Sequence, residues 1–347
     1  MNFITIALLY LGTVMGAGFA SGRECWQYFG VFGNRGYLGL IIETALFVGI
    51  GLMTAFLARR LNTADLSKIL LPSGHERTEK LFGLAVGVLI YCGTISMTAA
   101  GGSLLYQRFG LPKAVGGFFI ALLVIITVIG GFERVAGVFK IIMPFLFIIV
   151  VGLAVYVGIT FDAVPYADVE PDVSSLAPVW PLGAVVYVTY NIMGTIPINS
   201  QSALSAAGPG HAYAGVAAGG LLLATIGFVL LRALLKDPEL SQSLDLPMLG
   251  LAGKISPVAG RVFFLVLFFA IYSAATSCFY GFSTRFGEKK RNSKIIFFSL
   301  LAFFLGMLGF KNMVKYIYPA MGYFGLLIII LMTVRTVHEL KRAAENK

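Results

Sequence analysis

The residues best suited to chemistry lie in a run of small and polar residues inside the first apolar segment. Residues 12–24 read Gly-Thr-Val-Met-Gly-Ala-Gly-Phe-Ala-Ser-Gly-Arg-Glu, with Gly16, Gly18 and Gly22 close together. Each glycine costs a helix about 1 kcal/mol relative to alanine, so the run predicts an interrupted helix. In a membrane, backbone freed by such an interruption must be buried in protein or line a watery cavity. We therefore expect a polar ligand to be held here.

An interrupted helix offers two kinds of free backbone group. The carbonyl oxygens that end its first piece can coordinate a cation. The N–H groups that begin its second piece lie at the positive end of a helix dipole, which suits a carboxylate. The amides near Ala17, Gly18 and Phe19 are the candidate site for the carboxylate of a substrate, since a glycine lets a ligand approach the backbone closely.

Charged side chains occur inside apolar segments, and such residues at membrane depth are functional candidates by default. Arg23 and Glu24 follow the glycine run, and Glu43 sits in the apolar stretch 40–46. Either carboxylate could bind the amine of a substrate or carry a proton. Either could instead pair with Arg23 and fix the interrupted helix. The sequence leaves these alternatives open.

The composition is that of a membrane protein with many spans. Hydrophobic residues make up 58% of the 347 residues and charged residues 12%, against about 25% charged in soluble domains. The mean hydropathy is +0.88. The net charge of +10 falls mostly in loops, so topology explains it and nucleic acid is not an expected partner. The cysteines and histidines show no metal-ligand spacing and no catalytic motif appears, so we expect neither a resident cofactor nor an enzyme.

A helix needs about 20 apolar residues to cross a bilayer, and ten segments are candidates. The prediction is therefore an all-α polytopic membrane protein with the lipid bilayer as a partner and no separate soluble domain. The expected spans are residues 3–29, 37–58, 81–107, 114–130, 138–160, 179–205, 213–235, 258–281, 294–310 and 316–335.

Charges in the connecting segments predict the orientation of the chain. The segments 59–80 and 282–293 and the tail 336–347 carry lysine and arginine, whereas 161–178 carries acidic residues and no lysine or arginine. Basic segments favour the cytoplasmic side of a membrane. We therefore expect both termini in the cytoplasm, with the chain in the cytoplasmic membrane of a bacterium.

The sixth span carries a second set of helix-breaking residues. Asn191, Gly194 and Pro197 interrupt its apolar sequence, and proline removes a backbone donor and clashes with the preceding turn. Paired interruptions in corresponding spans indicate the binding site of a secondary transporter. Polar side chains near the second interruption and a phenol on the third span could line the same pocket as the first. They are Tyr187, Tyr190, Asn191, Thr195 and Tyr91.

The two interruptions divide the chain into two halves of five helices. Because five is odd, the halves must have opposite orientations in the membrane. The predicted parts are the first half (1–160), an acidic extracytoplasmic loop (161–178), the inverted second half (179–335) and a cytoplasmic tail (336–347).

This arrangement resembles the LeuT-type fold of the amino acid–polyamine–organocation superfamily over about the whole chain. The run at 16–24 resembles the hallmark of the YkvI-type family of bacterial amino-acid permeases. Three segments are similar to the sodium-coupled symporters of this fold: 12–18 to the break in their first helix, 140–148 with its Met-Pro to their fifth helix, and 273–277 to the sodium motif of their eighth helix.

The resemblance implies a Na⁺ site, for which a hard cation needs several oxygen ligands. The ligands carried over are the carbonyls of Gly12, Met15 and Ser273 and the hydroxyls of Thr276 and Ser277. In a proton-coupled relative a lysine ammonium could replace the ion. The similar symporters have a lysine at the position of Lys140 too, so that residue does not argue for protons.

The resemblance fails at the outer gate. In the similar symporters an arginine pairs with an acid on the tenth helix, whereas residues 316–335 contain no Asp or Glu. Arg23 is therefore a gate candidate without a known partner. Tyr323 is a second gate candidate, together with Tyr316 and Tyr318 on the same span.

These features predict secondary active transport of a small amino-acid-like or organic-amine substrate by alternating access, coupled to Na⁺. A proton-coupled transporter, or a facilitator of an organic cation, is the alternative. A channel fits less well because no repeated filter is present in the sequence, and an intramembrane enzyme would need a catalytic constellation that is absent from it. Substrate identity, symport or exchange, and oligomeric state stay open.

Overall fold

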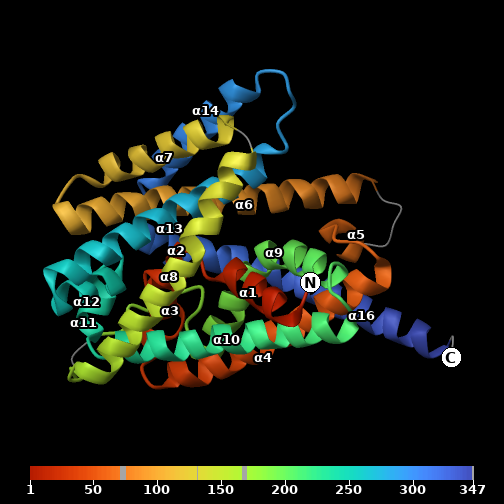
Figure 1. The fold of residues 1–347 in the computed structure, drawn as a ribbon, viewed down its shortest axis with the longest axis horizontal. Helices are drawn as coiled ribbons and strands as arrows, with labels where there is room; N and C mark the ends of the chain where they lie inside the picture. The colour runs from red at the N-terminus through yellow and green to blue at the C-terminus, as the bar shows by residue number, and fades with distance from the viewer. Residues whose placement is uncertain (71–75, 131, 166–169, 346–347) are drawn as a thin grey trace.

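Apolar helices make up the framework of this chain, which is known here from a computed structural model (Figure 1). Within the part of the chain that the structure describes, all regular structure is helical. The described residues are 1–70, 76–130, 132–165 and 170–345, with the side chains of 67, 76–81, 132–144 and 343 left aside.

Each of the ten predicted spans coincides with helix. The first span is divided into α1 (Phe3–Val14), α2 (Ala17–Ala20) and α3 (Arg23–Tyr28). The others are α4 (Arg35–Leu61), α6 (Glu76–Phe109), α7 (Lys113–Ile129), α8 (Phe132–Thr160), α9 (Trp180–Leu204), α10 (Pro209–Leu234), α13 (Pro257–Ser283), α14 (Arg291–Gly306) and α16 (Tyr318–Glu345).

Six described helices are long and apolar enough to cross a membrane. They are α4, α6, α9, α10, α13 and the helical run from Phe310 to Arg342, whereas α1, α7 and the 145–160 part of α8 are shorter apolar helices. The total of ten spans therefore stays a prediction.

Short helical elements occupy the connections between these helices. They are η1 (Gly30–Phe32), α5 (Leu66–Leu70), α11 (Pro238–Ser243), α12 (Pro247–Ile255), α15 (Phe310–Asn312) and the π-helical turn η3 (Met313–Ile317).

Proline and capping residues set where several helices begin. Pro209, Pro247 and Pro257 are the first residues of α10, α12 and α13, where a missing N–H costs nothing and the fixed φ suits a helix. The Ser256 hydroxyl also accepts a hydrogen bond from the backbone N–H of Ala259 and caps α13. These starts are therefore local consequences of the sequence.

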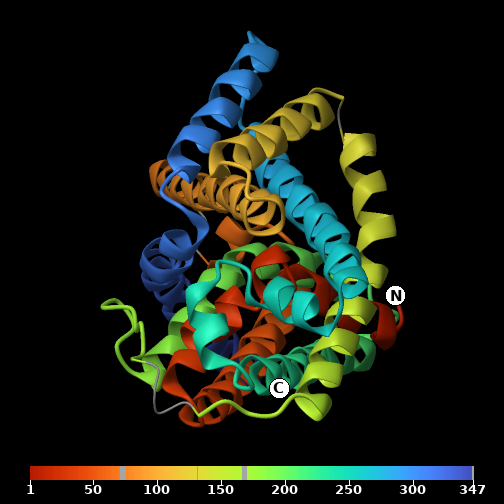
Figure 2. The ribbon, with the colours of Figure 1, turned by 90° about the vertical axis from the view of Figure 1, so that its left-hand side faces the viewer.

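The long helices form two groups that lie one above the other in both views (Figures 1 and 2). In the lower group α1, α4, α9 and α10 pack on one another. In the upper group α6, α7, α13 and α14 do the same. Each group thus combines helices from both halves of the chain, so neither half forms a core alone.

Three elements join the two groups. Helix α8 runs across both (Figures 1 and 2) and packs on α13 of the upper group and α10 of the lower. The run from α15 to α16 contacts α6 of the upper group through α15 and η3, and α16 itself packs on α9 and α4 of the lower group. The short helix α2 contacts α13, so the interruption in the first span lies between the two groups.

The chain connections gather at two opposite ends of the helices. At one end the Met1 ammonium donates to the Ser205 carbonyl, at 2.5 Å. At the same end Arg59 donates to the Ala203 carbonyl, and Arg60 pairs with Glu339. The other end holds the segment 170–178, which contacts α3, α11 and η3.

The predicted break in the sixth span is wrong, because α9 is one continuous helix from Trp180 to Leu204. Its polar side chains bond to the helix itself: Asn191 donates to the Tyr187 carbonyl and Thr195 to the Asn191 carbonyl. Pro197 removes one backbone donor without ending the helix. Neighbouring helices pack around α9, and the helix continues past Pro197.

The contact between α9 and α16 should be intolerant of added volume. A Cβ at Gly325 would lie 1.9 Å from the Thr189 carbonyl oxygen, which is backbone and cannot turn aside. We expect Gly325→Ala to lower the free energy of unfolding by about 1–3 kcal/mol. Thermal unfolding in lipid nanodiscs measures this.

The matched control is Gly152→Ala on α8, where a Cβ would meet no atom within 4 Å. Alanine favours helix there, so stability should stay equal or rise slightly. Equal losses in both variants would contradict the close contact at Gly325.

Candidate functional site

The first span is interrupted at Met15 and Gly16. Helix α1 ends at Val14, and the Gly16 N–H donates to the Val14 carbonyl at 2.7 Å. In a regular helix that N–H would bond to the Gly12 carbonyl, which is therefore released. Helix α2 then begins at Ala17. The interruption predicted from the glycine run is thus confirmed, and it lies just before Gly18.

A second interruption follows at Ser21 and Gly22. Gly22 has φ of +80°, a left-handed conformation that side chains disfavour. The Ser21 hydroxyl donates to the Gly18 carbonyl at 2.8 Å, and the Ser21 carbonyl accepts from the Met248 N–H on α12 at 2.9 Å. This link sets the direction in which α3 starts at Arg23.

Glu24 is turned back against α2. A Cβ at Gly18 would lie 1.8 Å from its Oε1 atom, so only glycine leaves room for this carboxyl group. Its Oε2 atom accepts a hydrogen bond of 2.6 Å from the Tyr190 hydroxyl on α9. Glu24 is 5% exposed. The structure thus joins three predicted site residues, Gly18, Glu24 and Tyr190.

Aromatic rings surround this carboxyl group, and we call them the tyrosine cluster. Tyr190 packs against three other tyrosine rings at centroid distances of 4.8–5.8 Å. Two members bond outward: the Tyr28 hydroxyl donates to the Val314 carbonyl and the Tyr318 hydroxyl to Ser96. The cluster consists of Tyr28, Tyr187, Tyr190 and Tyr318, with Phe19 beside Tyr187.

The predicted amide site at Ala17, Gly18 and Phe19 is buried. Helix α2 has no side chain capping its start, and all three residues are buried. Since Glu24 packs on Gly18, the carboxyl of Glu24 lies on the side of α2 where the sequence predicted a substrate carboxylate.

The predicted cation ligands come from two elements that lie in contact, the first span and α13. Thr276 is fully buried, and its hydroxyl has no hydrogen-bond partner among the described residues. The Ser273 hydroxyl donates to the Ala270 carbonyl. Met15 is buried and Gly12 half-buried, whereas Ser277 lies on an exposed part of α13. Among the predicted cation ligands, Thr276 therefore stands out, because its buried hydroxyl has no hydrogen-bond partner among the described residues.

Arg23 and the two glutamates do not form the pairs that the sequence left open. Arg23 is fully buried, and its Nη2 donates to the Gln27 side chain at 2.6 Å. Its Nη1 donates to the Gln242 carbonyl at 3.2 Å. Neither oxygen of Glu43 has a hydrogen-bond partner within the described residues. Neighbouring residues on a helix point about 100° apart, so Arg23 faces away from Glu24.

A set of hydrogen bonds closes one end of the molecule, and we call it the strap. It consists of the segment 170–178 and the residues of α3, α11 and η3 that bond to this segment. The Asp172 carboxylate forms ion pairs with Lys311 and Lys315, and Lys315 also donates a hydrogen bond to it. Its backbone is held by the Gln27 and Gln242 side chains. Lys315 lies in a π-helical turn, a distortion often found at functional sites. Basic residues before α16 thus pair with an acid in the loop 170–178, whereas the tenth span supplies no acid, as its sequence indicates.

Asp172 is stabilised as a carboxylate. Partial burial alone would raise the pKa of Asp172, but hydrogen bonds and charges from Lys315 and Lys311 hold that pKa below its usual value. Its side chain is 30% exposed, so solvent screens the pairs in part. The strap is therefore a polar closure of this end, with modest strength per contact.

Other predicted residues serve as packing or anchoring groups. The Tyr91 hydroxyl donates to the Phe298 carbonyl on α14, and its ring packs on Phe282, so it holds α6 against α14. Asn191 and Thr195 bond within α9, as described above. Tyr323 is exposed and donates to the Leu176 carbonyl, which anchors the strap segment to α16.

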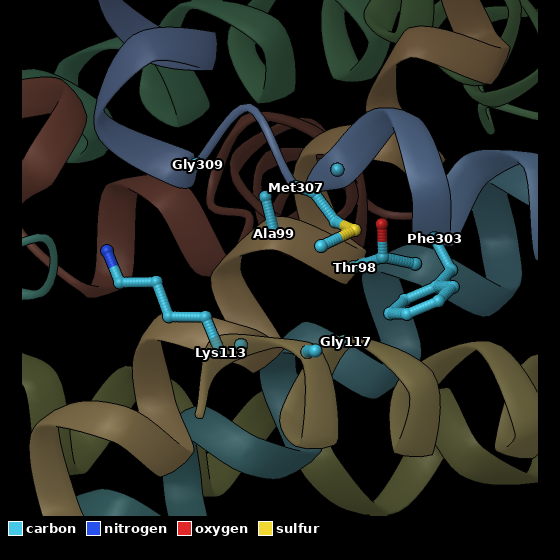
Figure 3. A pocket seen from close by; sticks show the side chains of 10 residues that line it. Thr98, Ala99, Lys113, Gly117, Phe303, Met307 and Gly309 are labelled. Carbon is cyan, nitrogen blue, oxygen red and sulfur yellow. The ribbon is translucent and has the colours of Figure 1, made fainter. Parts of the chain in front are cut away.

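Two cavities lie away from Glu24. A small one of about 70 Å³ is enclosed between α6, α7 and α14, with Thr98, Phe303 and Met307 around it (Figure 3). A larger, open groove of about 810 Å³ lies beside Arg35 and Trp180. Neither is lined by the tyrosine cluster, and the candidate site considered below is the buried environment of Glu24.

Several residues of this region were missed by sequence reasoning. Ser96, Gln242 and Asp172 come from distant segments and carry no motif. Tyr28 had a weak signal, since it lies in the first span soon after Arg23, whereas Tyr318 was predicted as a gate candidate but not as a neighbour of Glu24. Their role depends on tertiary contact, which one sequence does not display.

The chain has relatives of similar length, although no family model matches it. The uncharacterized protein YyaD of Bacillus subtilis (strain 168) is 25% identical over 334 residues, 94% of this chain and of the relative. The uncharacterized membrane protein YkvI of the same strain is 24% identical over 344 residues, 93% of each chain. The predicted likeness to YkvI is therefore found, at low identity.

A solved structure shares the fold. The crystal structure of the Eremococcus coleocola manganese transporter, in complex with an aromatic bis-isothiourea substituted compound, matches with a TM-score of 0.52 at 12% identity. The match covers 96% of this chain and 85% of that one. Together with the apolar helices, these findings identify a multi-pass membrane protein.

The close approach of Glu24 to Gly18 can be tested by a double-mutant cycle. Gly18→Ala should destabilise the protein by about 2 kcal/mol, because the new methyl group displaces the carboxyl from Tyr190. In a Glu24→Ala background the same change should cost far less, since the clashing atoms all belong to Glu24. Thermal unfolding of the four proteins measures the coupling.

Gly16→Ala is the matched control, since a Cβ there meets no atom within 4 Å and the φ of −82° suits any residue. A Gly18→Ala cost that is the same with and without Glu24 would contradict the proposed contact.

The strap should weaken in acid. The pKa of Asp172 is lower in the folded than in the unfolded protein, where it is about 3.9. Its contribution, about 1 kcal/mol at most, is therefore complete above the unfolded pKa and is lost as pH falls through the folded pKa. Asp172→Asn should remove this part of the pH dependence from thermal unfolding curves.

The exposed Asp162, in the same connection, provides the control variant Asp162→Asn. If both variants retain the wild-type pH profile below pH ~4, the ion pairs contribute nothing to stability.

Proposed function

We propose that this chain is a secondary active transporter for a small amino-acid-like or organic-amine substrate. The observation that carries the proposal is Glu24, a buried carboxyl group at an interrupted helix that is bonded to one tyrosine and unpaired with any described lysine or arginine. Interrupted helices at membrane depth are typical of transporter binding sites. The shared fold with a solved manganese transporter supports transport as the general activity.

The chemistry around Glu24 favours a cationic group on the substrate. A buried carboxylate needs a positive partner, and an amine supplies one. The faces of tyrosine rings attract cations, and four such rings stand around this carboxyl group. The manganese named for the structural neighbour is not adopted as the substrate here, because this site offers one carboxylate among phenols and no cluster of metal ligands in its described residues.

Movement between the two helix groups is the proposed transport step. The group of α1, α4, α9 and α10 and the group of α6, α7, α13 and α14 meet at α2, which carries Gly18. Rocking one group against the other would expose Glu24 to either end in turn. We also propose that the two groups reflect a LeuT-type repeat of five plus five helices, because each group takes its members from matching places in both halves.

We propose that the strap lies on the extracytoplasmic side and that both termini are cytoplasmic. The end with Met1, Arg59 and Arg60 carries basic residues, which favour the cytoplasm. Arg23 then belongs to the outer closure through the Gln242 carbonyl, and Tyr323 ties the strap segment to α16. The strap closes the outer end in the conformation described.

Na⁺ is the proposed coupling ion. The released Gly12 carbonyl lies at the end of α1, and the unpartnered Thr276 hydroxyl lies on α13, which contacts the next piece of the first span, α2. An unpartnered buried hydroxyl is costly unless something binds it. The carbonyls of Met15 and Ser273 complete the proposed set, and Ser277 would have to turn inward to join it.

Uptake into proteoliposomes tests transport and coupling together. With pooled radiolabelled amino acids and choline as the probe, an inward Na⁺ gradient should drive accumulation. Thr276→Ala should raise the Na⁺ concentration for half-maximal uptake by about tenfold, the loss expected for one hydrogen-bond-strength contact to a charge. Glu24→Gln should abolish uptake.

Thr225→Ala is the matched control, because that hydroxyl is exposed and bonds within α10 to the Leu221 carbonyl. Uptake that ignores Na⁺ and is unchanged by Thr276→Ala would overturn the ion site. A conductance without substrate coupling would overturn the transporter.

A further inference from the structure

Glu43 is a buried acid that the proposed substrate and sodium sites do not use. It lies in the middle of α4 and is 0% exposed. Neither carboxyl oxygen has a hydrogen-bond partner among the described residues. By contrast, Glu24 accepts a hydrogen bond, and Glu339 pairs with arginines. A fully enclosed carboxyl group without any partner needs an explanation of its own.

The groups that face Glu43 come from four elements. The titratable ones close enough to interact with its charge are Tyr10 on α1, Cys25 on α3 and Tyr187 on α9. From α10 it meets backbone, since a Cβ at Gly227 would lie 3.8 Å from its Oε2 atom. None of these groups carries a positive charge.

The cations of the packed helices are engaged elsewhere. On α10, Arg232 donates to the Gly158 carbonyl of α8. On α16, Arg335 pairs with Glu339, one turn along its own helix, and Arg60 at the far end of α4 pairs with the same acid. A charged Glu43 would therefore be an isolated anion in an apolar interior, which costs so much that such a group takes up a proton instead.

We propose that Glu43 is a proton-binding site, separate from the substrate site at Glu24 and coupled to it through Tyr187. The proposal rests on the proposed transport function, to which it adds a second coupled ion. Binding is simple: a proton from water joins the carboxylate and gives a neutral acid, and the reverse step returns the proton to water. Glu43 is 0% exposed and belongs to no cluster of metal-ligating side chains among the described residues, so a proton rather than a metal ion is the proposed ligand.

Tyr187 provides the link between the two acids. Its hydroxyl is buried and has no partner among the described residues, so it is available to a charged Glu43 as a hydrogen-bond donor. Its ring packs on Phe47, one turn after Glu43 on α4, and on Tyr190, whose hydroxyl holds Glu24. Loss of the proton would draw the Tyr187 hydroxyl toward α4, and the ring contact would pass that shift to the substrate site.

Infrared difference spectroscopy tests the proton site without any substrate. In purified protein in lipid at neutral pH, Glu43→Gln should remove a carbonyl band of a protonated, buried carboxylic acid. Glu239→Gln, a change at an exposed acid on α11, should leave the band in place. No lost band in Glu43→Gln, or a carboxylate band that shifts with added Na⁺, would overturn the proposal.

Transport assays test the coupling. In proteoliposomes with pooled radiolabelled amino acids and choline, an inward proton gradient added to a fixed Na⁺ gradient should raise accumulation by the wild-type protein. Glu43→Gln should lose that increase completely. It should keep substrate counterflow in the presence of Na⁺, because counterflow needs no net proton movement. Tyr187→Phe should weaken the increase and keep the infrared band. Wild-type accumulation that ignores the proton gradient would overturn the coupling.

The two proposals fail in different ways. If the wild-type protein shows neither uptake nor counterflow, the proposed function fails, and the infrared result still decides whether Glu43 binds a proton. If uptake occurs and Glu43→Gln behaves as wild type in both assays, the proton site fails and transport stands.

Discussion

The close approach of the Glu24 carboxyl to the backbone of Gly18 is the constraint on which the rest of the site depends. No other residue at position 18 leaves space for the carboxyl group, which in turn meets the Tyr190 hydroxyl. To reach back to α2, Glu24 needs the sharp turn that the positive φ of Gly22 provides. One glycine therefore makes the space and the other makes the turn that fills it.

The adjacency of Arg23 and Glu24 joins the candidate site to the strap. They are neighbours at the start of α3, yet Glu24 points to the tyrosine cluster and Arg23 to the carbonyl of Gln242. That carbonyl also accepts from Lys311, which pairs with Asp172. A rotation of this short helix that moves Glu24 must move Arg23 too. Movement of Glu24 and movement of the strap are therefore mechanically linked, with no long pathway between them.

Sequence reasoning succeeded where the signal was local and failed where it was tertiary. The ten helical segments and the interruption in the first span follow from apolar runs and from glycine, whose cost does not depend on neighbours. The same reasoning predicted a break at Pro197, and that prediction was wrong. Side chains and packed helices can satisfy the backbone groups that a proline leaves without a partner in a helix. Arg23 could not be assigned a distant partner, because its acceptors are the Gln27 side chain one turn along α3 and the Gln242 carbonyl, and any residue type supplies a carbonyl.

The unbroken α9 changes what the site can use for binding. With two interrupted helices, a substrate could be held by backbone groups from both sides. Here the first span supplies released backbone, and α9 supplies side chains instead, with the phenols of Tyr187 and Tyr190. Phenol hydroxyls donate to carboxylates and their rings attract cations. In the proposed function, a site built in this way depends on a carboxyl group to hold an amine, and Glu24 takes the part that a second helix end would otherwise share.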